Sequence, residues 1–154
     1  MSNFLFILLV SLRLMTVSPF MVEGQSMDPT LYDKELFLID KQISAPSDLK
    51  RGDIVVFSTD DDFFYVKRII GLPGETVRLE GSLLAIKNGD GVYRALNEPY
   101  LLDATVDYGD KRYFLIPPDE YFVMGDNRAH SKDSRTFVYP YVKFSQIYGR
   151  YIYP

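Results

Sequence analysis

The sequence contains no cysteine, no tryptophan and a single histidine, His130. Without cysteine there can be no disulfide bond, no thiol nucleophile and no cysteine-ligated metal, and one histidine excludes a multi-histidine metal centre. Positive charge is also scarce, because 17 lysines and arginines against 21 acidic residues leave a net charge of −4. This balance argues against a nucleic-acid-binding surface. We therefore expect no metal, no cofactor and no nucleic-acid partner.

Aromatic residues, in contrast, are abundant, with 12 tyrosines and 11 phenylalanines among 154 residues. This composition is typical of β-strands, and the length suits one domain. Turn residues recur between short apolar runs, and no amphipathic helix is indicated after residue 22, so we expect a mainly β, antiparallel domain. The expected strands are residues 35–40, 54–57, 63–70, 77–79, 83–86, 113–116, 121–124 and 147–152, with a looped excursion over 95–110.

Residues 3–22 form an apolar N-terminal run. As one helix, about twenty residues would span roughly 30 Å, the thickness of a bilayer core. Arg13 lies near its middle, where a cation costs about 2.5 to 3.5 kcal/mol, but the apolar neighbours can offset this cost. We predict one membrane-anchoring helix over residues 1–22 and a β-rich domain over 23–154. A cleaved signal peptide and a surface-lying amphipathic helix are the alternatives.

A candidate nucleophile follows this run, in the stretch 23–31, which reads E-G-Q-S-M-D-P-T-L. Ser26 lies between Gly24, which allows close backbone approach, and Pro29, which restricts the chain and lacks an N–H donor. These residues can present an exposed hydroxyl on a tight turn. They are equally typical of an ordinary turn.

A candidate base lies in the apolar run F-F-Y-V-K-R-I-I at residues 63–70. Strand alternation places Lys67 on one face with aromatic and aliphatic neighbours, and an apolar site lowers a lysine's pKa. A neutral Lys67 could deprotonate Ser26 in a Ser-Lys dyad. The alternatives are a solvent-facing lysine on an edge, a Ser26–His130–aspartate triad and an unspecified pair of carboxylates.

The third unusual stretch is G-D-N-R-A-H-S-K-D-S-R at residues 125–135. It follows an expected core strand and has no aliphatic side chain larger than alanine. Such a segment is either a solvated loop or a polar network that holds a site in place.

Taken in order, four stretches resemble the bacterial type I signal peptidases, membrane-bound serine proteases that remove signal peptides from exported proteins. Residues 24–31 (G-Q-S-M-D-P-T-L) are similar to the family's nucleophile box, and residues 51–57 (R-G-D-I-V-V-F) to its second box. Residues 65–75 (Y-V-K-R-I-I-G-L-P-G-E) are similar to its lysine box, and residues 125–135 to its final box. The resemblance covers most of the chain and favours the dyad.

The resemblance implies that Ser26 is the nucleophile and Lys67 the general base. Many members of the family bind the oxyanion with a serine hydroxyl at the position of Gly24, and this chain lacks that hydroxyl. The oxyanion would therefore be bound by backbone donors at Ser26 and Gly24. Ser131 would hydrogen-bond the lysine amine. The remaining charged residues of the final box would support the site: Asp126, Arg128, Asp133 and Arg135.

The implied substrate is an extended signal peptide that pairs with strand edges and has small residues one and three positions before the cut. Its cleft would be formed by Glu23, Gly24, Tyr65 and Val66, with Met27 and Leu31 narrowing the pockets. The family also implies coiled antiparallel sheets and the Gram-positive arrangement, in which one anchor in the cell membrane carries an extracytoplasmic catalytic domain.

Two other functional classes remain open at this point. One is a pilus-cluster relative that binds pilin precursors as an assembly factor without necessarily cleaving them. The other is a self-cleaving repressor-type protease, for which the acidic chain supplies no DNA-binding domain.

Overall fold

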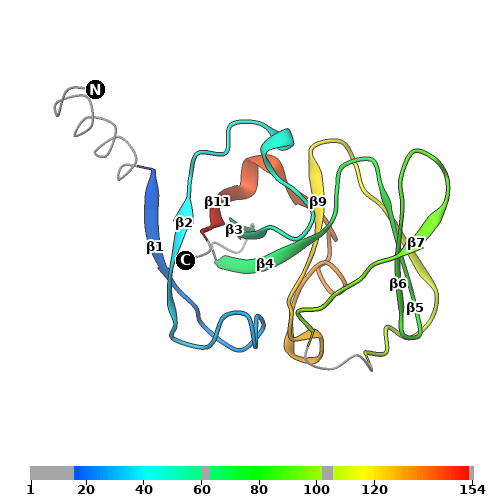
Figure 1. Cartoon of the computed structure of the whole chain (residues 1–154), viewed down its shortest axis with the longest axis horizontal. Helices are drawn as coiled ribbons and strands as arrows, with labels where there is room; N and C mark the ends of the chain where they lie inside the picture. Colours follow the sequence, from blue (N-terminus) through cyan, green and yellow to red (C-terminus); the bar gives the residue numbers. More distant parts are fainter. Residues whose placement is uncertain (1–15, 60–62, 102–105, 153–154) are drawn as a thin grey trace.

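The strands of the protein form two antiparallel sheets that lie side by side (Figure 1). The structure is a computed structural model and describes residues 16–59, 63–101 and 106–152. The larger sheet has seven strands and the smaller has four. This arrangement confirms the expected mainly β fold.

The seven-stranded sheet carries both ends of the described chain. Its strands, in spatial order, are β1 (Val17–Met21), β2 (Leu36–Asp40), β11 (Ile147–Tyr151), β3 (Ile54–Ser58), β4 (Phe64–Gly71), β9 (Glu120–Met124) and β10 (Val142–Lys143).

The strands of the four-stranded sheet lie between β4 and β9 along the chain, although β4 and β9 are neighbours in the larger sheet. Its spatial order is β7 (Tyr93–Ala95), β6 (Leu83–Lys87), β5 (Thr76–Glu80) and β8 (Arg112–Leu115). The helices of the described chain are three short 3-10 turns: η1 (Pro46–Asp48), η2 (Arg128–His130) and η3 (Phe144–Gln146).

All eight expected strands are present, with ends that differ by at most two residues. The sequence did not predict β1, β7 or β10, of which the last two have three residues or fewer. The expectation of one helix over residues 3–22 is wrong for its last part, because Val17–Met21 is strand β1 and pairs in register with β2. Residues 1–15, including Arg13, lie outside the described residues. Within the described ranges, no helix has the length and apolarity needed to cross a bilayer.

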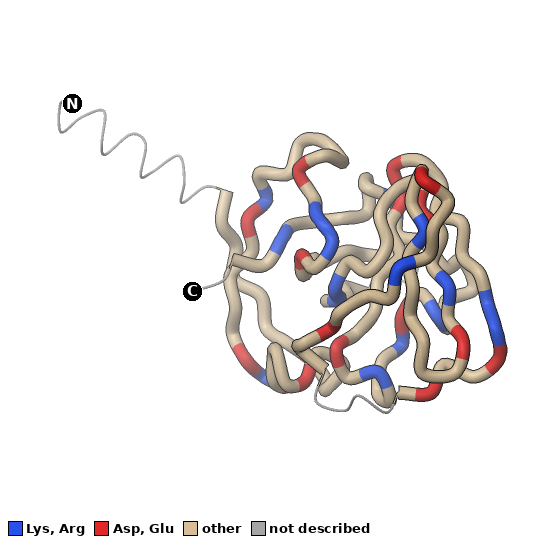
Figure 2. The backbone as a smooth tube through the Cα atoms, turned by 45° about the vertical axis from the view of Figure 1, so that its right-hand side comes forward, with Lys and Arg blue, Asp and Glu red and all other residues tan. Residues whose placement is uncertain are grey.

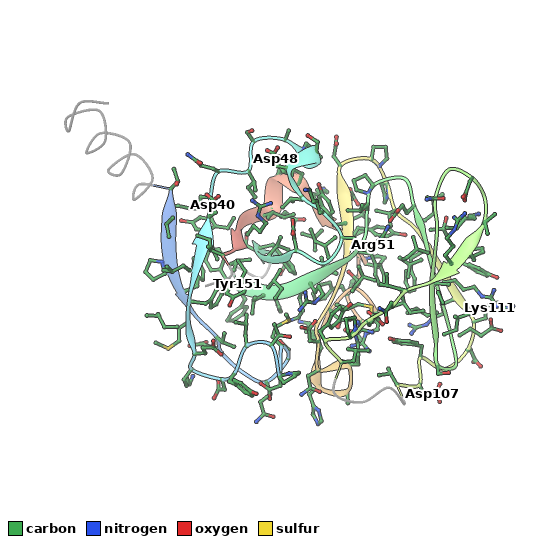
Figure 3. All side chains as sticks on the ribbon, viewed as in Figure 1. Asp40, Asp48, Arg51, Asp107, Lys111 and Tyr151 are labelled. Atoms are coloured by element: carbon green, nitrogen blue, oxygen red, sulfur yellow. The ribbon has the colours of Figure 1, made fainter. Side chains whose placement is uncertain are left out.

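A shared apolar core joins the two sheets. Ile70 and Phe122 of the larger sheet belong to one buried cluster with Val77 and Ile86 of the smaller sheet. At the same junction, the Arg51 guanidinium donates to the carbonyl of Ile70 at 2.5 Å. Arg51 is labelled near the centre of Figure 3. The smaller sheet is therefore packed directly against the strand that carries Lys67.

Charged residues of both signs are interspersed over the chain, as Figure 2 shows. Several of them form ion pairs on the smaller sheet, such as Arg78 with Glu80 and Arg94 with Asp90.

Candidate active site

Ser26 lies in the turn between β1 and β2, and the buried residues that follow it anchor this turn. Met27 and Leu31 are fully buried in the core, and the Leu31 N–H donates to the carbonyl of Met27 at 3.0 Å. Gly24 enters the turn at φ +91°, a conformation that favours glycine. The side chain of Ser26 is thus held at the surface by residues that cannot move without opening the core.

Lys67 projects from β4 towards this turn, with only 3% of its surface exposed. Its Nζ lies 2.7 Å from Ser26 Oγ and donates to the carbonyl of Val66 at 2.8 Å. Burial lowers the pKa of Lys67 to about 8, although the carboxylates of Asp133 and Asp126 oppose this shift. The structure therefore brings the two predicted dyad residues into hydrogen-bond distance.

Asp133 forms the centre of the polar loop 125–135. It is fully buried and accepts hydrogen bonds from the Gly125 N–H at 3.0 Å and from Arg135 Nε at 2.8 Å. Burial alone would raise the pKa of Asp133, but the Arg135 guanidinium, the Gly125 N–H and the Ser131 hydroxyl together outweigh burial and lower it. The loop therefore contains a polar network, in which Asp133 and Arg135, two of the residues indicated by the sequence, form an ion pair.

Asp126 connects this loop to the strand of the lysine. Arg68, the residue after Lys67, donates to Asp126 through Nε at 2.8 Å and through Nη2 at 2.6 Å. Thr30, four residues after Ser26, donates to the same carboxylate at 2.5 Å. Asp126 is therefore joined to the lysine strand by a buried, bidentate ion pair with Arg68 and to the serine turn by the hydrogen bond from Thr30.

Gly125 allows the loop to lie against Ser26. A Cβ at this position would be 2.4 Å from the carbonyl oxygen of Ser26 and 2.3 Å from Ser131 Oγ. The Asn127 N–H donates to the same Ser26 carbonyl at 3.0 Å. This close approach places Ser131 beside the dyad. Its buried Oγ does not form the expected hydrogen bond to the lysine amine in this structure, although the hydroxyl lies near enough to Asp133 to lower the pKa of that carboxyl.

A cleft of about 760 Å³ opens at the dyad. Glu23 and Gly24 line it on one side and Tyr65 and Val66 on the other, as expected. β9 pairs with β4 only from Arg68 onwards, so it does not cover the preceding part of β4. An extended peptide could pair along this edge.

Two expectations for the cleft need correction. Met27 and Leu31 do not line it, because both side chains point into the core with Val22 and Ile39. They support the cleft from beneath. Sequence spacing alone could not separate a pocket wall from a core residue on the same tight turn.

The backbone donors at the site also differ from the expectation. The Gly24 N–H donates to Asp33 Oδ1 at 2.7 Å, so this donor is already engaged. The Ser26 N–H, in contrast, has no acceptor among the described residues. Of the two expected donors, the Ser26 N–H is therefore the one left available for an oxyanion in the geometry observed.

His130 lines the cleft, but its Nδ1 contacts Asn127 Oδ1 at 3.2 Å and no contact with Ser26 is found in the described chain. The structure therefore gives no support to a triad through His130. Among the described residues, no group of three or more histidine, aspartate or glutamate side chains could hold a metal ion.

Sequence reasoning missed several residues of the network. Arg68 was visible as a second cation in an apolar strand, while Thr30, Gly125 and Asn127 carried no separate signal. Glu98 and Tyr100, which contact the network from the smaller sheet, lie in the span that appeared least regular.

The sequence and the fold of the chain are similar to those of known proteins. The family described as "Signal peptidase, peptidase S26" matches residues 1–154. Signal peptidase I from Bacillus amyloliquefaciens is 41% identical over 140 residues, which cover 84% of this chain and 71% of that protein. Signal peptidase I T from Bacillus subtilis is 40% identical over 141 residues, covering 84% and 69%. The crystal structure of a signal peptidase I from Enterococcus faecalis matches with a TM-score of 0.53 and 32% identity, covering 66% of this chain and 95% of that one.

Proposed function

The chain belongs to the signal peptidase family, peptidase S26, and we propose that it is a serine endopeptidase that removes signal peptides from exported precursor proteins. Ser26 is the nucleophile and Lys67 the general base. The observation that carries these roles is the 2.7 Å contact between Ser26 Oγ and the buried Lys67 Nζ.

Burial makes Lys67 a usable base near neutral pH. With an ordinary pKa of 10.5, about one lysine in 3,000 is neutral at pH 7, whereas a pKa of about 8 raises this to roughly one in ten. Only the neutral amine has the lone pair needed to accept the Ser26 proton.

The reaction proceeds through an acyl-enzyme. Lys67 takes the Ser26 proton while Oγ attacks the scissile carbonyl carbon, and the Ser26 N–H donates to the developing oxyanion. The Lys67 ammonium then gives its proton to the departing amine, and an ester links the signal peptide to Ser26. Lys67 next deprotonates a water molecule that hydrolyses this ester, which releases the signal peptide and restores Ser26.

The substrate lies extended between the Glu23–Gly24 and Tyr65–Val66 segments. Phe37 and Val56, which also line the cleft, give it the apolar walls that suit small apolar side chains. The cell membrane is the site of action in this proposal, with the apolar residues that precede β1 as the attachment to the bilayer and an extracytoplasmic catalytic part. Exposed apolar side chains at the cleft, Met21, Phe63 and Phe64, support contact with lipid.

The test is cleavage of a panel of precursor proteins, including pilin precursors, by the full chain in detergent. Ser26→Ala should reduce cleavage at least about 1,000-fold without changing the fold, because the nucleophile is lost. Ser82→Ala, at an exposed serine in the β5–β6 turn, is the matched control. Cleavage that survives in Ser26→Ala would refute the proposal, and precursor binding without cleavage by the wild type would favour an assembly role.

A further inference from the structure

A segment of the smaller sheet's connection reaches back to the active site. Glu98 and Tyr100, which follow β7, each contact an arginine of the polar network. We call these two residues the strap. Neither lines the cleft at the dyad.

Glu98 holds Arg128 in a buried, bidentate ion pair. The exposed fractions of the two side chains are 8% and 2%, and Arg128 Nη1 donates to Glu98 Oε2 at 2.9 Å while Nη2 contacts Oε1. Arg128 Nε in turn donates to the carbonyl of Gly125 at 3.0 Å. Gly125 is the residue that lies against the carbonyl of Ser26. One carboxylate from the connection after β7 therefore holds the part of the loop that packs against Ser26.

Tyr100 contacts Arg68, the residue that follows Lys67 on β4. Its hydroxyl donates to Glu98 Oε1 at 2.6 Å, and its ring lies 4.0 Å from the guanidinium carbon of Arg68. A cation stacked on an aromatic ring is attracted to its face. Arg68 is adjacent to Lys67 and holds Asp126. The strap thus contacts both Arg68, which follows Lys67, and Arg128, which holds the loop that packs against Ser26.

We infer that Glu98 and Tyr100 are positioning residues that set the distance between Ser26 Oγ and Lys67 Nζ by holding Arg128 and Arg68 in place. The inference rests on the proposed function and identifies a further part of its machinery. A displacement of about 1 Å at a reacting pair can cost on the order of 100-fold in rate. The strap is therefore expected to act on kcat and not on substrate binding.

The first test compares steady-state cleavage by full-length variants. Glu98→Gln keeps the shape but loses the charge, and we expect kcat to fall about 10- to 100-fold with KM changed less than about twofold. Tyr100→Leu, which removes the ring, should lose about tenfold, whereas Tyr100→Phe, which keeps it, should lose less than about fivefold. Asp90→Asn is the matched control. Asp90 is an acid near the same sheet whose exposed ion pair with Arg94 is remote from the dyad, and its substitution should leave kcat unchanged.

The second test needs no substrate and separates positioning from folding. Lysine labelled with ¹³C at Cε reports the titration of Lys67 by NMR, with Lys67→Met identifying the resonance. A loosened loop admits water to the amine, which weakens the desolvation that keeps its pKa near 8. In Glu98→Gln the titration midpoint should therefore move upward, while Asp90→Asn should match the wild type.

The outcomes are distinguishable. If Glu98→Gln lowers the melting temperature but leaves kcat per folded molecule and the Lys67 titration unchanged, the strap is structural only and the inference is overturned. If the wild type cleaves no precursor, the proposed function fails. An upward shift of the Lys67 titration in Glu98→Gln would still support the positioning role.

Discussion

Lys67 combines burial with a task that requires it to be neutral. Its surroundings penalise the ammonium, and Asp126 and Asp133 are near enough to oppose the effect without reversing it. Two arginines occupy most of the hydrogen-bonding capacity of these carboxylates: Arg68 pairs with Asp126 and Arg135 with Asp133. The carboxylates are thereby kept from acting as full counter-ions of the lysine.

This burial predicts that Lys67 destabilises the folded protein near neutral pH. Its pKa in the folded protein is about 8, against 10.5 for an ordinary lysine, so the gross cost of the ammonium is about 3 kcal/mol. Lys67→Met also loses two hydrogen bonds of about 1 kcal/mol each. We expect a net gain in the free energy of unfolding of about 1 to 2 kcal/mol at pH 7, together with loss of cleavage.

The sign of the pH dependence follows from proton binding. Between pH 8 and 10.5 the unfolded lysine keeps its proton while the folded one loses it, so the wild type gains stability as pH rises. The advantage of Lys67→Met should be full below pH 8 and shrink above it. Urea unfolding at several pH values measures this, with exposed Lys143→Met as control. A difference between variants that does not change with pH would contradict the prediction.

At the scale of elements, the loop 125–135 connects structures that are distant in the chain. It begins directly after β9, bonds the carbonyl of Ser26 through Asn127, and holds the β4 strand through Asp126 and Arg68. Because β9 pairs with β4, the first residues of the loop emerge beside Lys67. The loop can therefore align a serine from one turn with a lysine from a strand.

Gly125 is the closest contact in this alignment, so Gly125→Ala should be damaging. The new Cβ would be 2.3 Å from Ser131 Oγ and 2.4 Å from the Ser26 carbonyl oxygen, which forces the loop or the turn to move. We expect a loss of about 1 to 3 kcal/mol in stability and of about 100-fold or more in kcat. Gly89→Ala is the matched control, since nothing lies within 4 Å of a Cβ there. Near wild-type cleavage by Gly125→Ala would show that the close packing is unnecessary.

On the scale of the whole molecule, the two sheets share a core, and the connection that follows β7 contacts the polar network beside the dyad. The apolar cluster at their junction contains residues of β4, β5, β6 and β9, and the strap crosses from the smaller sheet to the polar network. The smaller sheet is therefore expected to unfold together with the larger one.

Phe122→Ala tests this coupling. The Phe122 side chain is fully buried on β9, and its ring centroid lies 4.7 Å from that of Phe114 on β8. Truncation should cost about 3 to 5 kcal/mol through the cavity it leaves. Hydrogen exchange and circular dichroism should report one transition for both sheets. Leu115→Ala, at a side chain that is 68% exposed, should change stability by less than about 0.5 kcal/mol. Separate transitions would show that the sheets fold independently.

The choice of the Ser26–Lys67 dyad came from the resemblance to the signal peptidases, whereas local patterns in the chain were sufficient for the mainly β fold, eight of its strands and the apolar setting of Lys67. Each of these depends on near neighbours in sequence: alternation for the strands, turn residues for their ends, and an apolar strand around Lys67. The failure at β1 has the same origin. The apolar run at residues 3–22 has a helical length, and only pairing with β2 makes Val17–Met21 a strand.

Contacts between segments that are distant in the chain decided the remaining features. Met27 and Leu31 are core residues because the turn at Ser26 packs onto β2 and β3, and the Gly24 N–H is engaged because Asp33 folds back onto it. Glu98 and Tyr100 contact the polar network only because the two sheets pack together. Such contacts depend on which surfaces meet after folding, and this information is not contained in the spacing of residues along the chain.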